Sequence, residues 1–415
     1  MTRKTIADLS PNFFKNTRVL VRVDFNVPQN EDQSISDHSR IRAALPTIEH
    51  LRDAGAKVIL VSHLGRPKGP TEKLSLKPVA ERLSELLGTP ILFLPDCIGA
   101  EVVKGIEGMR AGDVCLLENV RFHAEEEKNE PGFARQLASV ADVYVNDAFG
   151  TAHRAHASTE GVSHHVKPAL AGLLMDRELK ALGDALDNPA RPFATVIGGA
   201  KVSSKIGVLE NLLDKVDVLV IGGAMAFSFL KAEGKEVGKS LVEDDRLEFC
   251  RGLLQKAREK SVKIVLPLDV ICAQKIEPGA QSSIHPVDQI PSDKMGLDVG
   301  PKTVAAINEA LSKSRTIVWN GPLGVFETEG FEAGTFAMID TLVDLTASGA
   351  RTIVGGGDSV AAIELKGVSP GQFSHVSTGG GASLEFLEGL ELPGVACLEK
   401  TEAVAASSTR MPPQE

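Results

Sequence analysis

The chain has 415 residues, of which 43% are hydrophobic and 24% are charged, and its formal net charge is −10. This length exceeds what one hydrophobic core usually serves, so two domains are expected. The acidic balance argues against a general nucleic-acid-binding protein, and the 4% aromatic content argues against a stacking platform for single strands.

The N-terminal segment carries basic residues with no apolar run behind them, so no secretory signal is predicted. The uncharged apolar run from Val218 to Leu230 is too short to span a bilayer and is interrupted by Gly222 and Gly223. The five cysteines form no CxxC pair, a pattern typical of buried free thiols in a reducing compartment. We therefore expect a cytoplasmic protein that does not bind membranes.

Short β-branched runs alternate with helical patterns along the whole chain. Such alternation predicts βαβ units and mostly parallel sheets, which bind ligands at the carboxyl ends of their strands. The predicted strands are Arg18–Val23, Lys57–Val61, Val114–Leu117, Asp142–Val145, Phe193–Ile197, Asp217–Ile221, Lys263–Leu266, Thr316–Val318 and Arg351–Val354.

The segment from Pro168 to Asn188 is predicted to form one helix that joins two domains. Proline suits a first helical turn, and leucines recur through the segment at roughly helical spacing. We expect a first domain over residues 1–170, this inter-domain helix over 168–188, and a second domain over 189–392. Residues 401–415 are small, polar and proline-ended, which predicts a disordered tail.

The residues that follow the predicted strands differ between the two halves. Late strands lead into glycines, as in "IGGA", "NGPLG", "VGGGD" and "STGGG". Early strands lead into polar and cationic residues that would form an anion pocket if they converge at one sheet edge. These early residues are Arg22, Arg40, His63, Arg66, Arg121, His123, Arg154 and His156, with Asp24 and Asn26 placed to accept a substrate hydroxyl.

Lys201 and Lys205 follow "IGGA" at the predicted start of an amphipathic helix, in "GGAKVSSKIGVLENLL". Cations at a helix N-terminus oppose the helix dipole, and a bound anion would reverse that effect. Ordinary surface lysines are the alternative interpretation. The preceding glycines favour a phosphate site, since glycine lets the backbone approach a phosphate closely.

In "VGGGDSVAAIEL" three glycines precede Asp358, which opens another predicted helix. Asp358 is expected to cap that helix, to hold Mg²⁺ that bridges nucleotide phosphates, or to do both. Glu327, in "NGPLGVFE", is placed to accept hydrogen bonds from ribose hydroxyls. There is no Walker A motif and no GxGxxG after a strand, so neither a P-loop nor a standard dinucleotide site is predicted.

These segments, taken together and in order, resemble the phosphoglycerate kinase family over nearly the whole chain. The resemblance rests on "RVLVRVDFNVP", "SHLGRP", "ENVRFH", "NDAFGTAHRAHAS", "GGAKVSSKI", "NGPLGVFE", "GGGDSVAA" and "STGGGASLEFLEG". It implies two Rossmann-like lobes with mostly parallel sheets flanked by helices, joined by a hinge helix, in a monomer. It also implies that residues 393–400 pack back on the first domain.

The resemblance further implies reversible, Mg²⁺-dependent transfer of the acyl phosphate of 1,3-bisphosphoglycerate to ADP, giving 3-phosphoglycerate and ATP. This is a step of glycolysis, gluconeogenesis or carbon fixation, and it would proceed by in-line transfer with hinge closure. The expected partners are these small molecules, with no nucleic acid and no membrane.

Site residues follow from the same resemblance by motif. The acid substrate is expected to meet Asp24, Asn26, Arg40, His63, Arg66, Arg121 and Arg154. The nucleotide is expected to meet Gly199, Lys201, Lys205, Gly222, Gly223, Asn320, Pro322, Glu327, Gly356, Gly357, Asp358 and Ser359. Asp358 would hold the metal, and the transferred group would lie near Arg40, Lys201, Gly357 and Gly380.

A carboxylate acceptor is already ionised at neutral pH, so this reaction needs no general base. Catalysis then rests on positioning and on neutralisation of phosphate charge. Two other classes of protein stay open on the residues alone. They are a two-lobed sensor that closes on phosphorylated ligands without chemistry, and a nucleotide-linked oxidoreductase, which the missing fingerprint disfavours.

Overall fold

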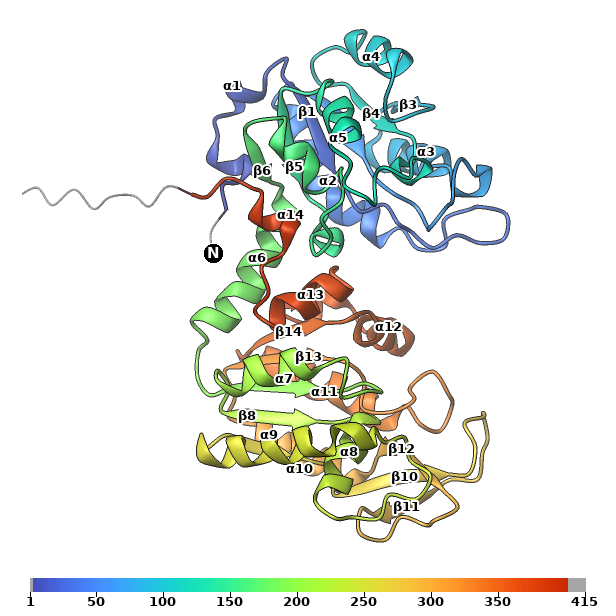
Figure 1. Cartoon of the computed structure of the whole chain (residues 1–415), viewed down its shortest axis with the longest axis vertical. Helices are drawn as coiled ribbons and strands as arrows, with labels where there is room; N and C mark the ends of the chain where they lie inside the picture. Colours follow the sequence, from blue (N-terminus) through green and yellow to red (C-terminus); the bar gives the residue numbers. More distant parts are fainter. Residues whose placement is uncertain (1–2, 402–415) are drawn as a thin grey trace, which may run out of the picture. The chain divides into compact units, whose positions relative to one another are not determined.

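The computed structural model describes residues 3–401 and divides into two compact units (Figure 1). The first unit contains the described residues up to Ala148, Ala155–Asp176, and the described residues from Gly394. The second contains Phe149–Arg154 and Arg177–Pro393. The division differs from the domain limits expected from sequence in three places: Phe149–Arg154 and Pro393 belong to the second unit, and the boundary near the inter-domain helix falls between Asp176 and Arg177. Except for Thr401, the predicted disordered tail lies outside the described residues.

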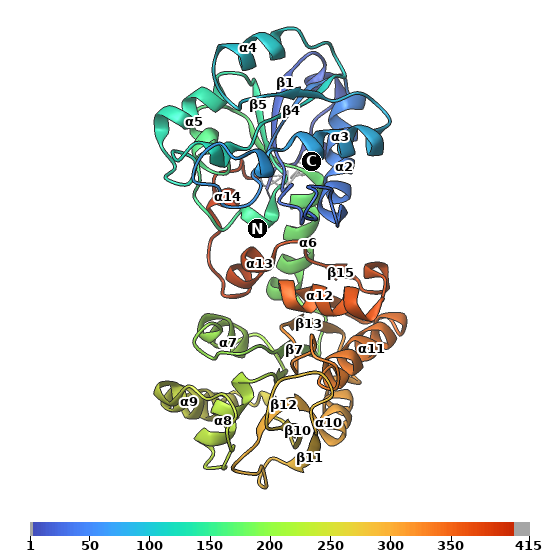
Figure 2. The same ribbon diagram turned by 90° about the vertical axis from the view of Figure 1, so that its right-hand side faces the viewer.

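The first unit is built on a six-stranded parallel sheet in the order β3-β4-β2-β1-β5-β6. Arg22, the last residue of β1, pairs with Val61 and Asn146 at the ends of β2 and β5, so these strand ends lie at one edge. Helices α2 and α3 lie on one side of the sheet and α5 on the other (Figure 2). The bounds are β1 Arg18–Arg22, β2 Lys57–Val61, β3 Leu92–Leu94, β4 Val114–Leu117, β5 Val143–Asn146, β6 Ala169–Ala171, α2 Ser39–Asp53, α3 Lys77–Leu87 and α5 Pro131–Ala138.

The prediction of one helix from Pro168 to Asn188 is wrong at its start. Ala169–Ala171 forms strand β6, which pairs with β5, and helix α6 covers Leu173–Asp187. The Asp147 carboxylate accepts hydrogen bonds from the backbone N–H groups of Leu174 and Met175 at 2.9 and 3.2 Å. Because the group that satisfies the helix N-terminus comes from another part of the chain, no local capping residue marks the true start.

The second unit also contains a six-stranded parallel sheet, in the order β15-β14-β13-β7-β8-β9. Helices α7, α8 and α9 lie on one side, and α10 and α11 lie on the other (Figure 2). Trp319 is fully buried in its core. The bounds are β7 Phe193–Ile197, β8 Val218–Ile221, β9 Lys263–Val265, β13 Thr316–Asn320, β14 Arg351–Gly355, β15 His375–Val376, α7 Ile206–Leu213, α8 Met225–Ala232, α9 Leu247–Glu259, α10 Pro301–Leu311, α11 Ala333–Ala347, α12 Gly357–Lys366 and α13 Gly380–Leu387.

A three-stranded antiparallel sheet in the second unit is absent from the sequence prediction. It comprises β10 (Asp269–Ala273), β11 (Ser283–Pro286) and β12 (Met295–Val299), with β10 in the centre. Its strands are short, and buried acids stand at the start of β10 and inside β12, which hides the hydrophobic pattern. Burial raises the pKa of one of them, Asp298, to about 7.

All nine strands predicted from the sequence are present, with ends that differ by no more than two residues. The strands β3, β6 and β15 were missed together with the antiparallel sheet; β3, β6 and β15 have two or three residues each, too few to show a periodic pattern. The remaining elements are α1 Pro11–Phe14, α4 Ala100–Glu107, α14 Pro393–Ala396 and the 3₁₀ helices η1 Ile6–Asp8, η2 Glu72–Leu74, η3 Val120–Phe122, η4 Phe149–Thr151, η5 Gly161–His164, η6 Asp244–Arg246 and η7 Pro370–Gln372.

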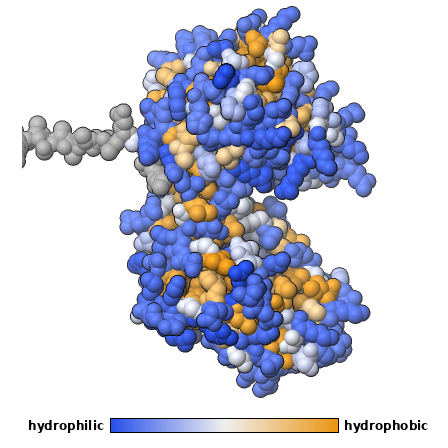
Figure 3. Space-filling model, in the orientation of Figure 1, coloured by the Kyte–Doolittle hydropathy of each residue, from blue (hydrophilic) through white to orange (hydrophobic). Residues whose placement is uncertain are grey.

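Within residues 3–401, none of the helices combines the length and apolarity needed to cross a bilayer. Polar residues cover most of the face drawn in Figure 3, and apolar areas interrupt them over the second unit. Large apolar side chains exposed in that unit include Leu241 and Ile276. Both line the pocket described below.

Candidate active site

In the first unit, the carboxyl end of the sheet holds a buried chain of hydrogen bonds that ends on His63. The Arg22 guanidinium donates through Nη2 to His63 Nδ1 at 3.1 Å and through Nε to Ser158 Oγ at 2.8 Å. Ser158 Oγ in turn donates to Glu126 Oε1 at 2.5 Å. With Nδ1 as acceptor, the His63 ring carries its proton on Nε2 and can donate it to an anion.

Glu126 is fully buried at the far end of this chain. Burial raises its pKa, and the charge of Arg22 with the Ser158 hydrogen bonds acts in the opposite direction. A carboxylate held there balances the buried arginine, which otherwise would cost several kcal/mol to remove from water.

Two neighbouring pairs complete the edge in the same unit. Arg40, near the start of α2, forms a 2.7 Å ion pair with Asp24, which follows β1. Asn26 accepts a hydrogen bond from the Gly65 N–H at 2.8 Å, and Arg121 donates to the Gly65 carbonyl at 2.7 Å. The turn after β2 is therefore held from both sides, between residues that follow β1 and β4.

The structure thus brings together Asp24, Asn26, Arg40, His63 and Arg121 at one sheet edge. Arg66 is exposed in the turn that follows His63. Arg154 belongs to the second unit, where its Nε contacts His153 Nε2 at 3.2 Å. The expected roles of Arg66 and Arg154 toward the acid substrate stay predictions.

In the second unit, three turns that follow parallel strands pack directly on one another. A Cβ on Gly223 would lie 2.5 Å from both the nitrogen and the oxygen of Gly199, and one on Gly321 would lie 2.4 Å from the Gly198 oxygen. Gly199 N–H donates to the Pro322 carbonyl at 3.1 Å. These glycines are needed for backbone contact between turns, a reason that the sequence analysis did not give.

A pocket of about 320 Å³ opens beside these turns. Glu327 and Asp358 line it, together with Gly199, Gly223 and Pro322. An apolar wall beside a few polar groups is the usual form of a site for a flat, partly polar ligand such as a nucleoside. The apolar wall includes Phe227, Leu241, Val270, Leu297, Leu323 and Val325.

Lys205 is a half-buried cation at the N-cap position of α7. Its Nζ donates to Asn320 Oδ1, and burial lowers its pKa to about 8, although Asp358 and Glu388 act to raise it. The expectation that Lys201 and Lys205 lie on the helix is wrong, because residues 202–205 form turns and α7 begins at Ile206. Lys201 precedes these turns and is exposed.

The expectation that Asp358 caps its helix is also wrong. Gly356, with φ of +90°, is the N-cap of α12, and Asp358 is the second helical residue, exposed in the first turn. The buried Ser359 hydroxyl accepts a hydrogen bond from the Gly321 N–H at 2.7 Å. Ser359 therefore holds the turn after β13, and its expected contact with the nucleotide stays a prediction.

The helix starts at Gly357 and Gly380 are open. A Cβ on either glycine would meet no atom within 4 Å, so internal packing does not require glycine at these positions. Among the described residues, the Asn320 side-chain nitrogen Nδ2 is buried without a hydrogen-bond partner. Free N–H groups at a helix start, an unpaired amide and a half-buried lysine in one unit fit a bound phosphate group.

Several residues that shape these sites were not found from the sequence. Asn119 holds the turn after β2 through hydrogen bonds with both the N–H and the carbonyl of Leu64. The only feature of the sequence that could have indicated Asn119 is its place in "ENVRFH". Nothing in the sequence indicates Ser158 and Glu126, because their hydrogen-bond partners are distant along the chain.

A nucleoside pocket with a lysine and helix starts in one unit, and an arginine–histidine edge in the other, define a nucleotide-dependent phosphotransferase of acidic substrates. A sequence model described as phosphoglycerate kinase matches residues 6–390. The chain belongs to the phosphoglycerate kinase family. It is accordingly a kinase with a carboxyl acceptor (EC 2.7.2.3), interconverting 1,3-bisphosphoglycerate and ADP with 3-phosphoglycerate and ATP.

Individual relatives agree with this assignment. The phosphoglycerate kinase of Thermosynechococcus vestitus is 58% identical over 399 residues, covering 96% of this chain and 100% of the relative. The cytosolic wheat enzyme is 56% identical over 399 residues, covering 96% and 99%. The solved phosphoglycerate kinase of Coxiella burnetii superposes with a TM-score of 0.86 at 42% identity, covering 95% and 98%.

We expect Lys205→Met to stabilise the protein while it abolishes tight nucleotide binding. A pKa lowered to about 8 means that the charged lysine opposes folding by roughly 3 kcal/mol at pH 7. Loss of the Asn320 hydrogen bond offsets part of this, leaving a gain of about 1–2 kcal/mol. The gain should shrink as pH rises from about 8, where the folded-state lysine begins to lose its proton, toward the unfolded-state value near 10.5.

Urea unfolding at pH 7 and pH 10, with ADP titration calorimetry at pH 7, measures both effects. Lys215→Met, just beyond the other end of α7, is the matched control and should alter neither nucleotide affinity nor the pH dependence of stability. A Lys205→Met protein less stable than the wild type at pH 7 would contradict the assigned cost of burial.

Gly223→Ala should disturb the contact between the turns. The new methyl would lie 2.5 Å from Gly199 in a backbone with φ of +65°, so we expect a loss of more than about 2 kcal/mol and weaker ADP binding. Gly234→Ala isolates the backbone cost, because Gly234 has φ of +86° with no atom near the added methyl. Equal losses in the two variants, measured by urea unfolding, would show that the turn contact contributes nothing.

Proposed function

We propose that the residues described above carry the phosphoglycerate kinase reaction in two sets, one for each substrate. In the first unit, His63 and Arg121 bind the phosphate or carboxylate of the acid substrate, while Asp24 and Asn26 accept its hydroxyl. Arg66 and Arg154 add further positive charge. The support is the sheet edge at which the first four of these residues gather together with Arg40, where the Arg22–Ser158–Glu126 chain holds His63.

In the second unit, the 320 Å³ pocket takes the nucleoside and Glu327 binds the ribose. Gly222 and Pro322 line the adenine side. Lys205, Gly199 and the N–H groups of Gly356 and Gly357 bind the phosphates. Asn320 and Ser359 support these turns, and the unpaired Asn320 amide is the group best placed among them to donate to a phosphate oxygen.

Phosphoglycerate kinases generally use the magnesium form of the nucleotide. We assign Mg²⁺ to Asp358, whose carboxylate is exposed in the first turn of α12 and lines the pocket. Carboxylate oxygen is a preferred ligand of this ion, and the bound ion would neutralise phosphate charge. Lys205 is near enough to Asp358 for their opposite charges to attract each other. A positive charge at Lys205 is therefore compatible with a metal-binding carboxylate at Asp358.

Transfer then depends on charge and position rather than on a general base. The acceptor carboxylate needs no deprotonation, and Arg40, Lys201 and the helix starts at Gly357 and Gly380 neutralise the oxygens of the moving group. We propose that the two units close on the substrates by hinge bending, which keeps the acyl phosphate from water.

The observation that carries the proposal is Lys205. It is half-buried at the N-cap of α7, its Nζ donates to Asn320 Oδ1, and Asp358 is near enough to act on its charge. A phosphate anion that pairs with this cation when bound explains its position. A sensor that only closes on ligands would need such a site but no acceptor chemistry. An oxidoreductase would need a nicotinamide site.

A coupled assay of ATP formation from ADP and 1,3-bisphosphoglycerate separates these classes. We expect ATP formation that stops on removal of divalent metal and resumes with Mg²⁺. Tight binding of both ligands with no ATP formed would favour a sensor, and reduction or oxidation of a nicotinamide would favour the oxidoreductase.

We also propose a monomer in the cytoplasm that binds neither nucleic acid nor membrane. Five free cysteines, four of them buried, are consistent with a reducing compartment. The net charge of −10 would repel nucleic acid. Sedimentation of the purified protein tests the oligomeric state.

A further inference from the structure

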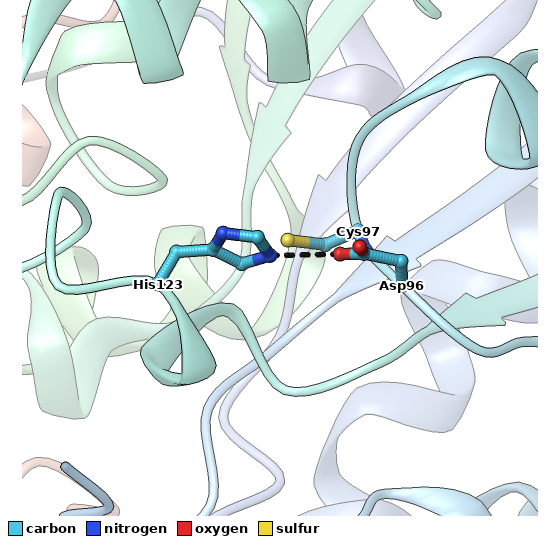
Figure 4. Close-up of side chains that lie close together, drawn as sticks. All are labelled: Asp96, Cys97 and His123. Carbon is cyan, nitrogen blue, oxygen red and sulfur yellow. Dashed lines mark hydrogen bonds and ion pairs between the residues drawn. The ribbon is translucent and has the colours of Figure 1, made fainter. Parts of the chain in front are cut away.

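The first unit contains a group of three different metal-ligating side chains, none of which is assigned to a substrate above. Asp96 and Cys97 lie in the loop between β3 and α4, and His123 follows η3 (Figure 4). Their ligand atoms, a carboxylate oxygen, Sγ and an imidazole nitrogen, all lie within 4.8 Å of one another. Within residues 3–401, this is the one such group of three.

We propose that Asp96, Cys97 and His123 form a binding site for a borderline-soft divalent cation of the Zn²⁺ type. The mixed oxygen, sulfur and nitrogen set is one that zinc accepts and that Mg²⁺, which prefers oxygen ligands, does not. The site is thus chemically distinct from the magnesium site assigned to Asp358.

The present geometry needs little adjustment to hold such an ion. Zinc bonds of about 2.0–2.3 Å in a tetrahedron place ligand atoms about 3.3–3.6 Å apart. His123 Nε2 and Asp96 Oδ1 are 2.8 Å apart, joined by a hydrogen bond whose proton the ion would replace. To bind the ion, these two atoms must move apart by about 0.5 Å. The distances from Cys97 Sγ to the other two ligand atoms must shorten by at most about 1.5 Å, and side-chain rotation can supply both changes.

The ligands are positioned by their surroundings. The His123 ring packs against the Phe133 ring, with centroids 5.2 Å apart, and its backbone N–H bonds to the Val120 carbonyl at 3.2 Å. The Cys97 backbone N–H donates to Asp96 Oδ1 at 2.6 Å, which fixes the adjacent pair. Cys97 is 1% exposed, whereas the Asp96 and His123 side chains are 47% and 27% exposed. The carboxylate and imidazole therefore give an ion access to a buried sulfur.

Binding exchanges protons for the metal. The Cys97 thiol loses its proton to solvent and coordinates as thiolate, His123 coordinates through deprotonated Nε2, and Asp96 supplies one oxygen. A water molecule completes four-coordination. The bound ion would tie the loop after β3 to the segment that carries Arg121, two residues before His123.

Cobalt(II) is the probe, since it replaces zinc and reports thiolate coordination by a near-ultraviolet charge-transfer band. The full-length protein, treated with chelator and kept free of nucleotide, is titrated with Co²⁺ alone and then with Zn²⁺. We expect one Co²⁺ per chain, a thiolate band, and loss of the band when Zn²⁺ displaces the cobalt.

Cys97→Ser should remove the band, and His123→Gln, which leaves the thiol in place, should weaken Co²⁺ binding more than tenfold. Cys250→Ser, another buried cysteine, is the matched control and should behave as the wild type. Thermal unfolding without metal confirms that each variant is folded. Absence of a stoichiometric band in the wild type, or its persistence in Cys97→Ser, would overturn the proposal.

Discussion

Lys201→Ala is expected to lower kcat by about 10²–10³-fold while it changes the dissociation constant of ADP by less than about fivefold. Lys201 is exposed just before the turns that lead into α7, in contrast to the half-buried Lys205. An exposed lysine pays little to stay charged. Its charge is therefore available for the oxygens of the transferred group, where stabilisation is specific to the transition state.

The measurement combines steady-state kinetics with calorimetric titration of ADP. Lys313→Ala is the matched control, because Lys313 is an exposed lysine just before the N-terminal end of β13, the end opposite Asn320. It should leave both constants unchanged. Equal losses of turnover and ADP affinity in Lys201→Ala would reduce that lysine to a binding contact.

Arg40→Ala should lower kcat by about 10³-fold, because the role proposed for its guanidinium is to neutralise charge on the moving phosphoryl group. The 2.7 Å ion pair with Asp24 orients the guanidinium. Since the Arg40 side chain is 37% exposed, loss of that pair should cost at most about 1 kcal/mol of stability. The effect on rate should therefore greatly exceed the effect on folding.

Arg40→Lys keeps a positive charge but loses the planar fork, and it should recover only part of the rate. Arg52→Ala, near the other end of α2 where Arg52 pairs with Asp53, is the matched control. Both are measured in the coupled ATP assay, with urea unfolding to follow stability. A wild-type turnover rate in Arg40→Ala would remove Arg40 from the mechanism.

The sequence predicted the parallel strands well because their buried residues form uninterrupted apolar runs rich in valine and isoleucine, such as "KVILV" in β2. It failed where partners from elsewhere in the chain decide the local structure. Ala169–Ala171 is a strand because β5 lies beside it, and α6 begins at Leu173 because Asp147 satisfies its first N–H groups. Neither cause can be seen within the segment itself.

The site shows the same limit. The positive charge of a lysine and its position after the glycines of "IGGA" can be read directly from the sequence, so Lys201 and Lys205 could be predicted to bind phosphate. Their burial could not be foreseen: one is exposed and the other has its pKa lowered to about 8. The glycines were predicted to serve only a ligand. The structure shows that Gly223 is also needed for the close contact between its turn and the turn at Gly199.

The first unit takes in the last described residues of the chain. Gly394 accepts a hydrogen bond from Asn146, and the Glu399 backbone bonds with Lys4 and Ala169. A ribosome must therefore finish almost the entire polypeptide before the unit that begins first can be completed, whereas most of the later one is a continuous stretch from Arg177 to Pro393. The unit that is synthesised first is therefore the one that is completed last. In a nascent chain that lacks these final residues, Asn146 in β5 and Ala169 in β6 would be without these hydrogen bonds.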